Sequence, residues 1–317
     1  MPRFHERRIQ QLRGSSYVVT LPKEWVEESG LRKGSAVTVI VERELLRIVP
    51  AGRRTSVQLS LDADLLGELV EDAMVACYEA GVSSVRVQTR RGRAEELVVR
   101  SRRLRERLQG LFVALESEGS IVVEISGDPF RSIEQALSVS LQSLVRALRR
   151  AESDVGSGGT PSPELEELLK DCLGYASTLK RMVSQMVAVP DEQTPFYAVS
   201  ALTEAASDLA DLVREIEEAL GSAGAGGQEL LAMAHLADAL EQLSALVVEL
   251  RNSVVVDQLA DLARSLQEAR RRTGARSLFR RAEDLVGSLM RLNALVTVAS
   301  EGRAGPGLHG RAWPSTT

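Results

Sequence analysis

The sequence predicts an α+β protein in three parts, and three observations lead to this prediction. Residues 1–54 alternate short β-branched segments with glycine-marked turns and are basic, with 11 Arg and Lys against 6 Asp and Glu up to residue 56. Residues 55–128 alternate strand-like with helix-like segments. Residues 129–300 repeat apolar side chains every three or four positions, as amphipathic helices do. We therefore expect three domains with these bounds, and a disordered Gly/Pro-rich tail over 301–317.

The first part is predicted to be a small β domain. Residues 15–21 are β-branched and aromatic and follow Gly14, which is typical of a strand after a turn. Pro22 ends this strand or opens a short helix over 23–29, and a hairpin follows at 36–49. About 50 residues of this kind cannot bury a self-sufficient core. Pairing with a second copy of the chain is therefore expected.

The middle part is predicted to be a small βαβαβ domain. Strand-like and helix-like patterns follow one another with bounds near 56–60, 62–81, 82–89, 95–115 and 120–125. This order gives a compact sheet with helices on one face.

The third part is predicted to be a helical bundle. Six helical segments are separated by Gly-, Pro- and Ser-rich breaks. The first carries apolar residues from 133 to 148 and ends at the break over 156–163, and the second runs to about 189. The other four have bounds near 196–220, 228–253, 257–272 and 276–299. Six helices spaced in this way suggest two three-helix repeats.

Several functional classes find no support in the sequence. Cys77 and Cys172 lie in helical patterns without zinc-site spacing, so both are interpreted as buried hydrophobic residues. No stretch approaches about 20 apolar residues, and residues 1–6 contain no apolar leader. The match of Ser177 and Lys180 to a four-residue nucleophile motif lacks its companion motifs. We expect a cytoplasmic protein that is not inserted in a membrane and is not an enzyme.

An acidic stripe marks the third predicted helix of the bundle. Glu204, Asp208, Asp211 and Glu215 fall within about 60° on a helical wheel, away from the apolar stripe. Carboxylate clusters of this kind suit divalent cations. The stripe has two interpretations: a solvated helix face, or a divalent metal site at Glu204, Asp208 and Asp211.

The first part resembles a known family. The run Thr20-Leu21-Pro22-Lys23-Glu24-Trp25, followed by Gly30-Leu31 and Gly34, is similar to the archaeal form of the AbrB/SpoVT swapped-hairpin domain over about residues 3–50. The resemblance implies an interleaved homodimer that forms a small β-barrel and binds duplex DNA through basic residues.

By position, the DNA-binding residues implied by this resemblance are Arg7, Arg8, Arg13 and Lys23. One departure stands out, because the short helix reads Val26-Glu27-Glu28 where bacterial DNA-binding members place an Arg pair. Glutamates there repel phosphate. The head therefore either binds DNA or serves only as a dimerisation domain.

The helical part resembles the PhoU family of phosphate-uptake regulators. The resemblance rests on Glu204 and Asp208, which match an E/D-x-x-x-D motif on the third helix of a repeat. In the second repeat Glu283 matches the first position, but Gly287 replaces the Asp. The resemblance implies surface metal clusters and a role in phosphate-uptake regulation.

The implied partner of this body is the phosphate ABC transporter ATPase or a signalling protein. Alternatives are a regulator that contacts only proteins and, from the acidic stripe, a metal-dependent phosphate-ester hydrolase.

The two predicted repeats differ in charge. Arg276, Arg280 and Arg291 lie on the same face of the last helix as Glu283. We therefore expect the acidic stripe and this arginine-bearing face to meet, within one chain or between chains, so that arginine replaces metal as the compensating charge.

Overall fold

A computed structural model describes residues 4–12, 14, 16–41, 45–51, 57–90, 94–127, 129–157, 162–188, 196, 198–222, 227–250 and 254–304. The protein is α+β, with a small N-terminal β region and a helical bundle in the C-terminal part. The chain divides into two compact units, Met1–Arg54 and Thr55–Thr317. Each unit is described by itself.

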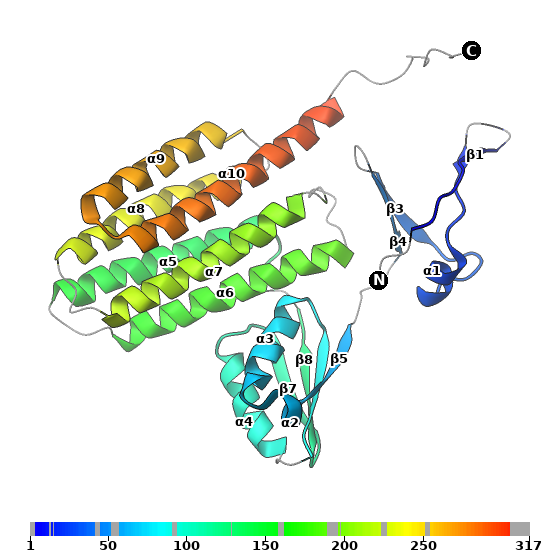
Figure 1. The fold of residues 1–317 in the computed structure, drawn as a ribbon, viewed down its shortest axis with the longest axis horizontal. Coiled ribbons are helices and arrows are strands. Elements are labelled where there is room, and N and C mark those ends of the chain that lie inside the picture. Colours follow the sequence, from blue (N-terminus) through cyan, green and yellow to red (C-terminus); the bar gives the residue numbers. More distant parts are fainter. Residues whose placement is uncertain are drawn as a thin grey trace. The chain divides into compact units, whose positions relative to one another are not determined.

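The first unit contains two β-hairpins and one short helix. Its elements are β1 (Gln10–Gln11), β2 (Tyr17–Val18), α1 (Lys23–Glu28), β3 (Val37–Val41) and β4 (Leu46–Pro50) (Figure 1). β1 pairs with β2 and β3 with β4, both antiparallel, in two separate two-stranded sheets. The single chain therefore does not close these strands into the predicted barrel.

Within the described residues of this unit, no side chain is buried. Large apolar side chains face solvent instead, and the most exposed are Phe4, Ile9, Tyr17 and Val41 at 94%, 72%, 69% and 71%. Strands without a covered face have almost no hydrophobic stabilisation. In a single copy, the described part of this unit therefore lacks a core of its own.

The second unit begins with a four-stranded sheet covered by helices on one face (Figure 1). The strands are β5 (Gln58–Asp62), β6 (Ser84–Gln88), β7 (Leu111–Ser117) and β8 (Ser120–Ile125), in the order β5-β6-β8-β7. β5 and β6 are parallel and the other pairs are antiparallel. The helices are α2 (Ala63–Leu66), a 3-10 turn η1 (Gly67–Leu69), α3 (Val70–Glu79) and α4 (Ala94–Arg105).

The predicted βαβαβ order was wrong in one respect, because part of the helix expected at 95–115 is a strand. α4 ends at Arg105, and β7 pairs with β8 along its length. Gly110 lies in the turn between α4 and β7 with φ 74°. A Cβ there would lie 2.4 Å from the carbonyl oxygen of Ser126. The apolar run from Leu111 fits a strand as well as a helix, and pairing with β8 selects the strand.

The six predicted helices of the bundle are confirmed within the described residues. They are α5 (Ile133–Gly156), α6 (Pro163–Ala188), α7 (Ala198–Ser222), α8 (Gly227–Glu249), α9 (Val256–Thr273) and α10 (Arg276–Ala304). α10 is longer than predicted, so residues 301–304 of the expected disordered tail are helical. Residues 305–317 of that tail lie outside the described residues.

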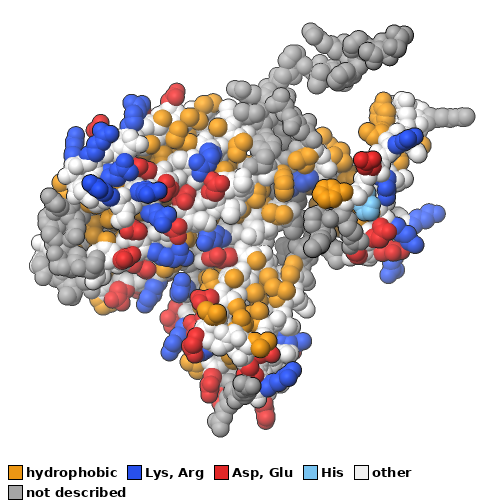
Figure 2. Space-filling model, in the orientation of Figure 1, with side chains coloured by type: hydrophobic (Ala, Val, Ile, Leu, Met, Phe, Trp, Pro, Cys, Tyr) orange, Lys and Arg blue, Asp and Glu red, His pale blue; other side chains and the backbone are white. Residues whose placement is uncertain are grey.

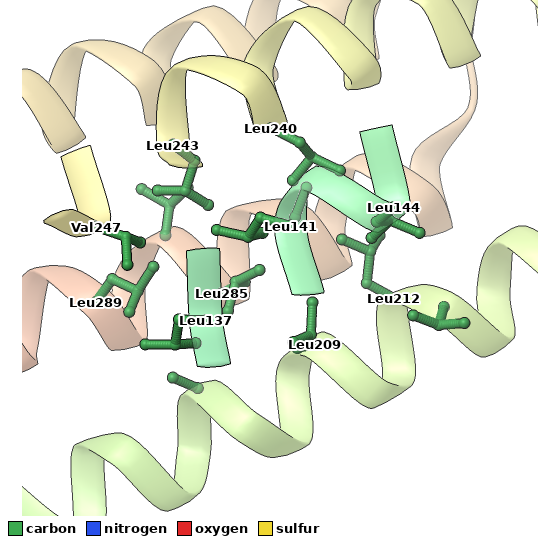
Figure 3. Packing of buried hydrophobic residues seen from close by; sticks show 14 of the residues in the cluster. Leu137, Leu141, Leu144, Leu209, Leu212, Leu240, Leu243, Val247, Leu285 and Leu289 are labelled. Atoms are coloured by element: carbon green, nitrogen blue, oxygen red, sulfur yellow. The ribbon is translucent and has the colours of Figure 1, made fainter. Parts of the chain in front are cut away.

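The helices pack so that each half of the bundle covers the other. α5 packs against α8 and α7 against α10, while α6 contacts α5 and α7, and α9 contacts α8 and α10. Figure 3 shows leucines of α5, α7, α8 and α10 pointing toward one another, including Leu141, Leu209, Leu240 and Leu285. These four side chains are at most 1% exposed. The leucine core joins the two halves into one body.

One helix corrects the expectation that no stretch approaches the length and apolarity needed to cross a membrane. Among the described residues, Leu231–Glu249 in α8 meets these criteria, with a mean hydropathy of 1.3. Half of it is buried in the bundle, and Asp238 on it pairs with Arg149 of α5. These contacts are those of a core helix of the bundle.

The sheet region and the bundle are joined through α3 and α6. The Tyr78 hydroxyl lies 3.0 Å from Thr178 Oγ1 and donates to the Gln109 carbonyl at 3.1 Å. Arg181 of α6 is 3% exposed and donates to the carbonyls of Tyr78 and Val82 at 3.2 and 2.7 Å. Its guanidinium also lies 5.2 Å from the centre of the Tyr78 ring. Although predicted as separate domains at 55–128 and 129–300, these segments belong to one compact unit.

The Ser177 and Lys180 motif also belongs to this junction. The Ser177 hydroxyl donates to Glu79 Oε1 at 2.8 Å, and Lys180 Nζ lies 3.6 Å from Glu79 Oε2. Glu79 thus bridges both side chains, which explains them as structural contacts between α3 and α6.

Candidate functional site

The basic residues predicted to contact DNA lie on the first unit. Arg7 and Arg8 are exposed on the segment before β1, and Arg7 Nη1 donates to the Glu6 carbonyl at 3.0 Å. Lys23 begins α1, and its Nζ lies 3.6 Å from Glu27 Oε1. Arg13 lies outside the described residues.

The charge on α1 does not favour phosphate. Beside Lys23 the helix carries Glu24, Glu27 and Glu28, and the Lys23–Glu27 pair compensates its single cation. Favourable contact with a phosphate backbone therefore has to come from Arg7 and Arg8 among the described candidates.

A hollow of about 390 Å³ lies beside α1 in the same unit. Apolar side chains from α1 and β4 form much of its wall, including Trp25, Leu46 and Ile48. Leu21 and Pro22 extend this wall along the segment before α1. Because the unit has no buried residues of its own in the described part, this apolar wall remains open in the single chain.

The acidic stripe of α7 faces α10 within the same chain. Glu204 Oε2 accepts from Arg291 Nη2 at 2.6 Å, and Asp208 Oδ2 accepts from the Ser288 hydroxyl at 2.5 Å. Asp211 pairs with Arg281 of α10 at 3.5 Å. The acidic stripe and α10 thus meet within one chain, and of the three arginines expected to face the stripe, Arg291 pairs with it.

The structure does not gather the carboxylates predicted to bind metal. No group of three or more His, Cys, Asp or Glu side chains in the described part of the chain is arranged to hold a metal ion. Glu204, Asp208 and Asp211 follow one another along α7, and each contacts a different partner on α10. Arginine and serine of α10 thus partner these carboxylates.

A pocket of about 480 Å³ lies along the acidic stripe of α7. Its wall includes Glu204, Asp208, Glu283, Asp284 and Arg291. Burial raises the pKa of Asp208 above its ordinary value, and Asp284 adds to the rise against the opposing effects of the Ser288 hydrogen bond and Arg291. The surroundings of Asp208 in this pocket therefore disfavour its charged form.

Glu283 is the second carboxyl of this pocket whose pKa is raised. Burial raises its pKa, although Arg270 lies 3.0 Å from its Oε2 and lowers it. Its Oε1 is buried and accepts no hydrogen bond from the residues that the structure describes. The lining of this pocket thus contains more carboxylates than cations.

Replacement of Asp208 by Asn should raise the thermal stability at neutral pH. Its folded pKa lies above the unfolded value, so the charged form costs stability, and this cost disappears as pH falls through the folded pKa. An amide oxygen can still accept from Ser288. We expect the melting temperature of the variant to exceed that of the wild type at pH 7, with a difference that shrinks on acidification.

Circular-dichroism melts between neutral and acidic pH provide this measurement. Asp261→Asn, at an exposed carboxylate of α9, controls for the loss of one negative charge. A variant that melts below the wild type at neutral pH would show that ionised Asp208 is stabilising.

Two residues of the site were not anticipated from the sequence. Arg281 and Ser288 are seven residues apart on α10, two helical turns, and so lie on one face with Arg291. The helical spacing from Arg291 could therefore have identified Arg281 in the sequence. Arg276 and Arg280 were expected to face the stripe, but they line another pocket at the start of α10.

Comparisons with known proteins concern the head alone. Residues 10–56 match the family model described as antidote-toxin recognition MazE, bacterial antitoxin. No curated protein and no solved structure matches the chain. The match includes Arg13 and Lys23 but not Arg7 and Arg8. It supports an N-terminal domain of the AbrB type.

Proposed function

We propose that this protein is a homodimeric regulator that binds duplex DNA through its first unit. The match of residues 10–56 to a MazE-type model supports a head of the DNA-binding or antitoxin type. The observation that carries the proposal is the absence of any buried side chain among the described residues of the first unit.

The dimer follows from the physical state of this unit. Its exposed apolar side chains and the hollow beside Trp25 present surface that water solvates poorly. A second copy supplies the same strands and can cover both hairpins at once. Swapping identical elements between protomers is a low-cost route to such a dimer.

The proposed DNA contact uses arginines that are present twice in the dimer, once in each chain. Arg7 and Arg8 of each chain provide four guanidiniums for phosphate oxygens. Phosphate contacts position a protein on DNA and do not read its sequence. Binding should therefore be weak and salt-sensitive unless other residues of the head contact bases.

The helical body is proposed to relay a signal of phosphate status to the head, as a phosphate-uptake regulator would. Support comes from its six helices and from Glu204 and Asp208 on α7 opposite Glu283 on α10. The partner is proposed to be the ATPase of a phosphate transporter or a signalling protein. Catalysis is not part of this proposal.

A second candidate function is regulation through protein contacts alone, with a head that only dimerises. The observation that favours it is the charge of α1, where Glu24, Glu27 and Glu28 outnumber Lys23. An antitoxin-type role, in which the head supports capture of a partner protein, belongs to this candidate.

Fluorescence anisotropy with duplex DNA separates the two candidates. With four phosphate contacts per dimer, affinity should fall about a hundredfold between about 50 and 200 mM salt. The double variant Arg7→Glu/Arg8→Glu should lose this binding by more than about tenfold, with a shallower salt dependence. Light scattering on the same samples should give twice the mass of one chain.

Arg264→Glu/Arg272→Glu is the matched control, because it changes the same charge on exposed arginines of α9. It should leave DNA binding unchanged. A dimer that binds no DNA at low salt would favour the second candidate, and a monomer would refute both.

A further inference from the structure

A pocket lined almost entirely by arginine lies at the turn between α9 and α10. Its volume is about 490 Å³, and its lining residues are Arg270, Arg271, Gly274, Arg276 and Arg280. Figure 2 shows Lys and Arg side chains gathered over this end of the helical body. None of these residues lines the pocket along the acidic stripe of α7.

Glu283 compensates part of this positive charge. It pairs with Arg270 at 3.0 Å, and the charge of Arg280 also lowers its pKa. Arg271, Arg276 and Arg280 are exposed and form no ion pair with any residue in the described ranges. Residues 57–300 carry 37 Asp and Glu against 26 Lys and Arg, so carboxylates are abundant elsewhere in this unit. Their absence from the pocket leaves three guanidiniums available to a ligand.

The start of α10 adds to this positive potential. Arg276 is its first residue, and no acidic side chain lies in its first turn. The amides of Ser277 and Leu278 have no backbone acceptor among the residues that are described. A helix N-terminus is positive, so cations there are unfavourable and an anion is stabilised. Arginines at this position destabilise the free protein slightly, and a bound anion would remove that cost.

We propose that this pocket binds a small anion that carries two or more linked phosphate groups. A guanidinium bonds phosphate oxygens in a bidentate manner, which suits the residue type. One phosphate monoester carries a charge of only about −1.5 to −2, less than the three free guanidiniums supply. The pocket volume lies in the range of small-molecule sites. A free oligophosphate and a nucleotide share this chemistry.

Calorimetric titration of the full-length protein tests the proposal. Inorganic tripolyphosphate and ATP should each bind with one site per chain at about 150 mM salt. Orthophosphate should bind at least about tenfold more weakly, because it compensates less charge. Tighter binding of ATP than of tripolyphosphate identifies a nucleotide ligand, and the reverse order identifies a free oligophosphate.

Arg276→Gln/Arg280→Gln should weaken tripolyphosphate binding at least about tenfold. Arg264→Gln/Arg272→Gln removes the same charge from exposed, ion-paired arginines of α9 and should change it by less than about twofold. Arg271→Gln provides a second pocket variant if the double variant does not fold, with the same direction of change.

Three results would overturn the proposal: no binding to the wild type, unchanged binding in the pocket variants, or equal weakening in the control. The proposal does not rest on DNA binding. The head variant Arg7→Glu/Arg8→Glu should bind tripolyphosphate as the wild type does, so failure of either proposal is recognised separately.

Discussion

Replacement of Arg181 by methionine should lower the free energy of unfolding by about 1–3 kcal/mol. The guanidinium is 3% exposed and donates to the carbonyls of Tyr78 and Val82. Methionine fills a similar volume but donates nothing, so both carbonyls lose their charge-assisted donor in a dry environment. The contact of the guanidinium with the Tyr78 ring is lost as well.

Urea unfolding of the full chain, followed by circular dichroism, measures this loss. Arg149→Met is the matched control, since Arg149 pairs with Asp238 and Glu241 at an exposed site on α5 and α8. Exposed ion pairs contribute about 0–1 kcal/mol, so the control should remain close to the wild type. Equal losses in the two variants would show that Arg181 acts only as a surface charge.

Replacement of Gly174 by alanine is expected to destabilise the protein by about 2 kcal/mol or more, although alanine is the better helix former. A Cβ on Gly174 would lie 2.1 Å from the carbonyl oxygen of Arg107, which follows α4. This oxygen belongs to backbone, so relief requires that α6 and the segment before β7 move apart. The same movement would stretch the hydrogen bonds between Tyr78, Gln109 and Thr178.

Hydrogen exchange of the segment around Gln109, together with the urea midpoint, reports on this variant. Faster exchange there and a lower midpoint are expected. Gly221→Ala near the end of α7 is the control, because a Cβ at that position meets no atom within 4 Å. It should raise stability by up to about 1 kcal/mol through helix propensity. A stabilised Gly174→Ala variant would mean that α6 and the segment after α4 are not in close contact.

Both expected effects concern the junction between α6 and the sheet region, at α3 and at the segment after α4. The bundle and the sheet region share a buried arginine, a tyrosine hydroxyl and a glycine with no room for a side chain. Such a junction transmits a displacement of α6 to the sheet region, because packed interiors do not deform freely.

Local sequence was sufficient for most elements of the second unit. The bounds of α5 and α6 follow from the apolar period and from the Gly/Pro-rich break between them. These signals depend on residues at most four apart, where steric and helix-face constraints act directly. β7 was missed for the complementary reason, because its apolar run suits either element until a partner strand is present.

The candidate site was predictable only in part. The four acidic residues of α7 and the arginines of α10 were visible as helix faces, which correctly indicated that the two faces meet. The individual partners were not visible. The sequence pattern assigned Arg276 and Arg280 to the stripe, whereas the packing of α10 against α7 brings Arg281 and Ser288 there instead.

The amino-acid sequence by itself determined the six helices, the short hairpins of the head and the shortage of core residues in its described part. Tertiary structure alone decided that Arg181 joins α6 to α3, that Arg291 pairs with Glu204 while Ser288 donates to Asp208, and that four arginines and Gly274 line one pocket. The reason is physical: periodicity and turn chemistry act between near neighbours, whereas the partner of a buried or charged side chain depends on which distant elements pack together.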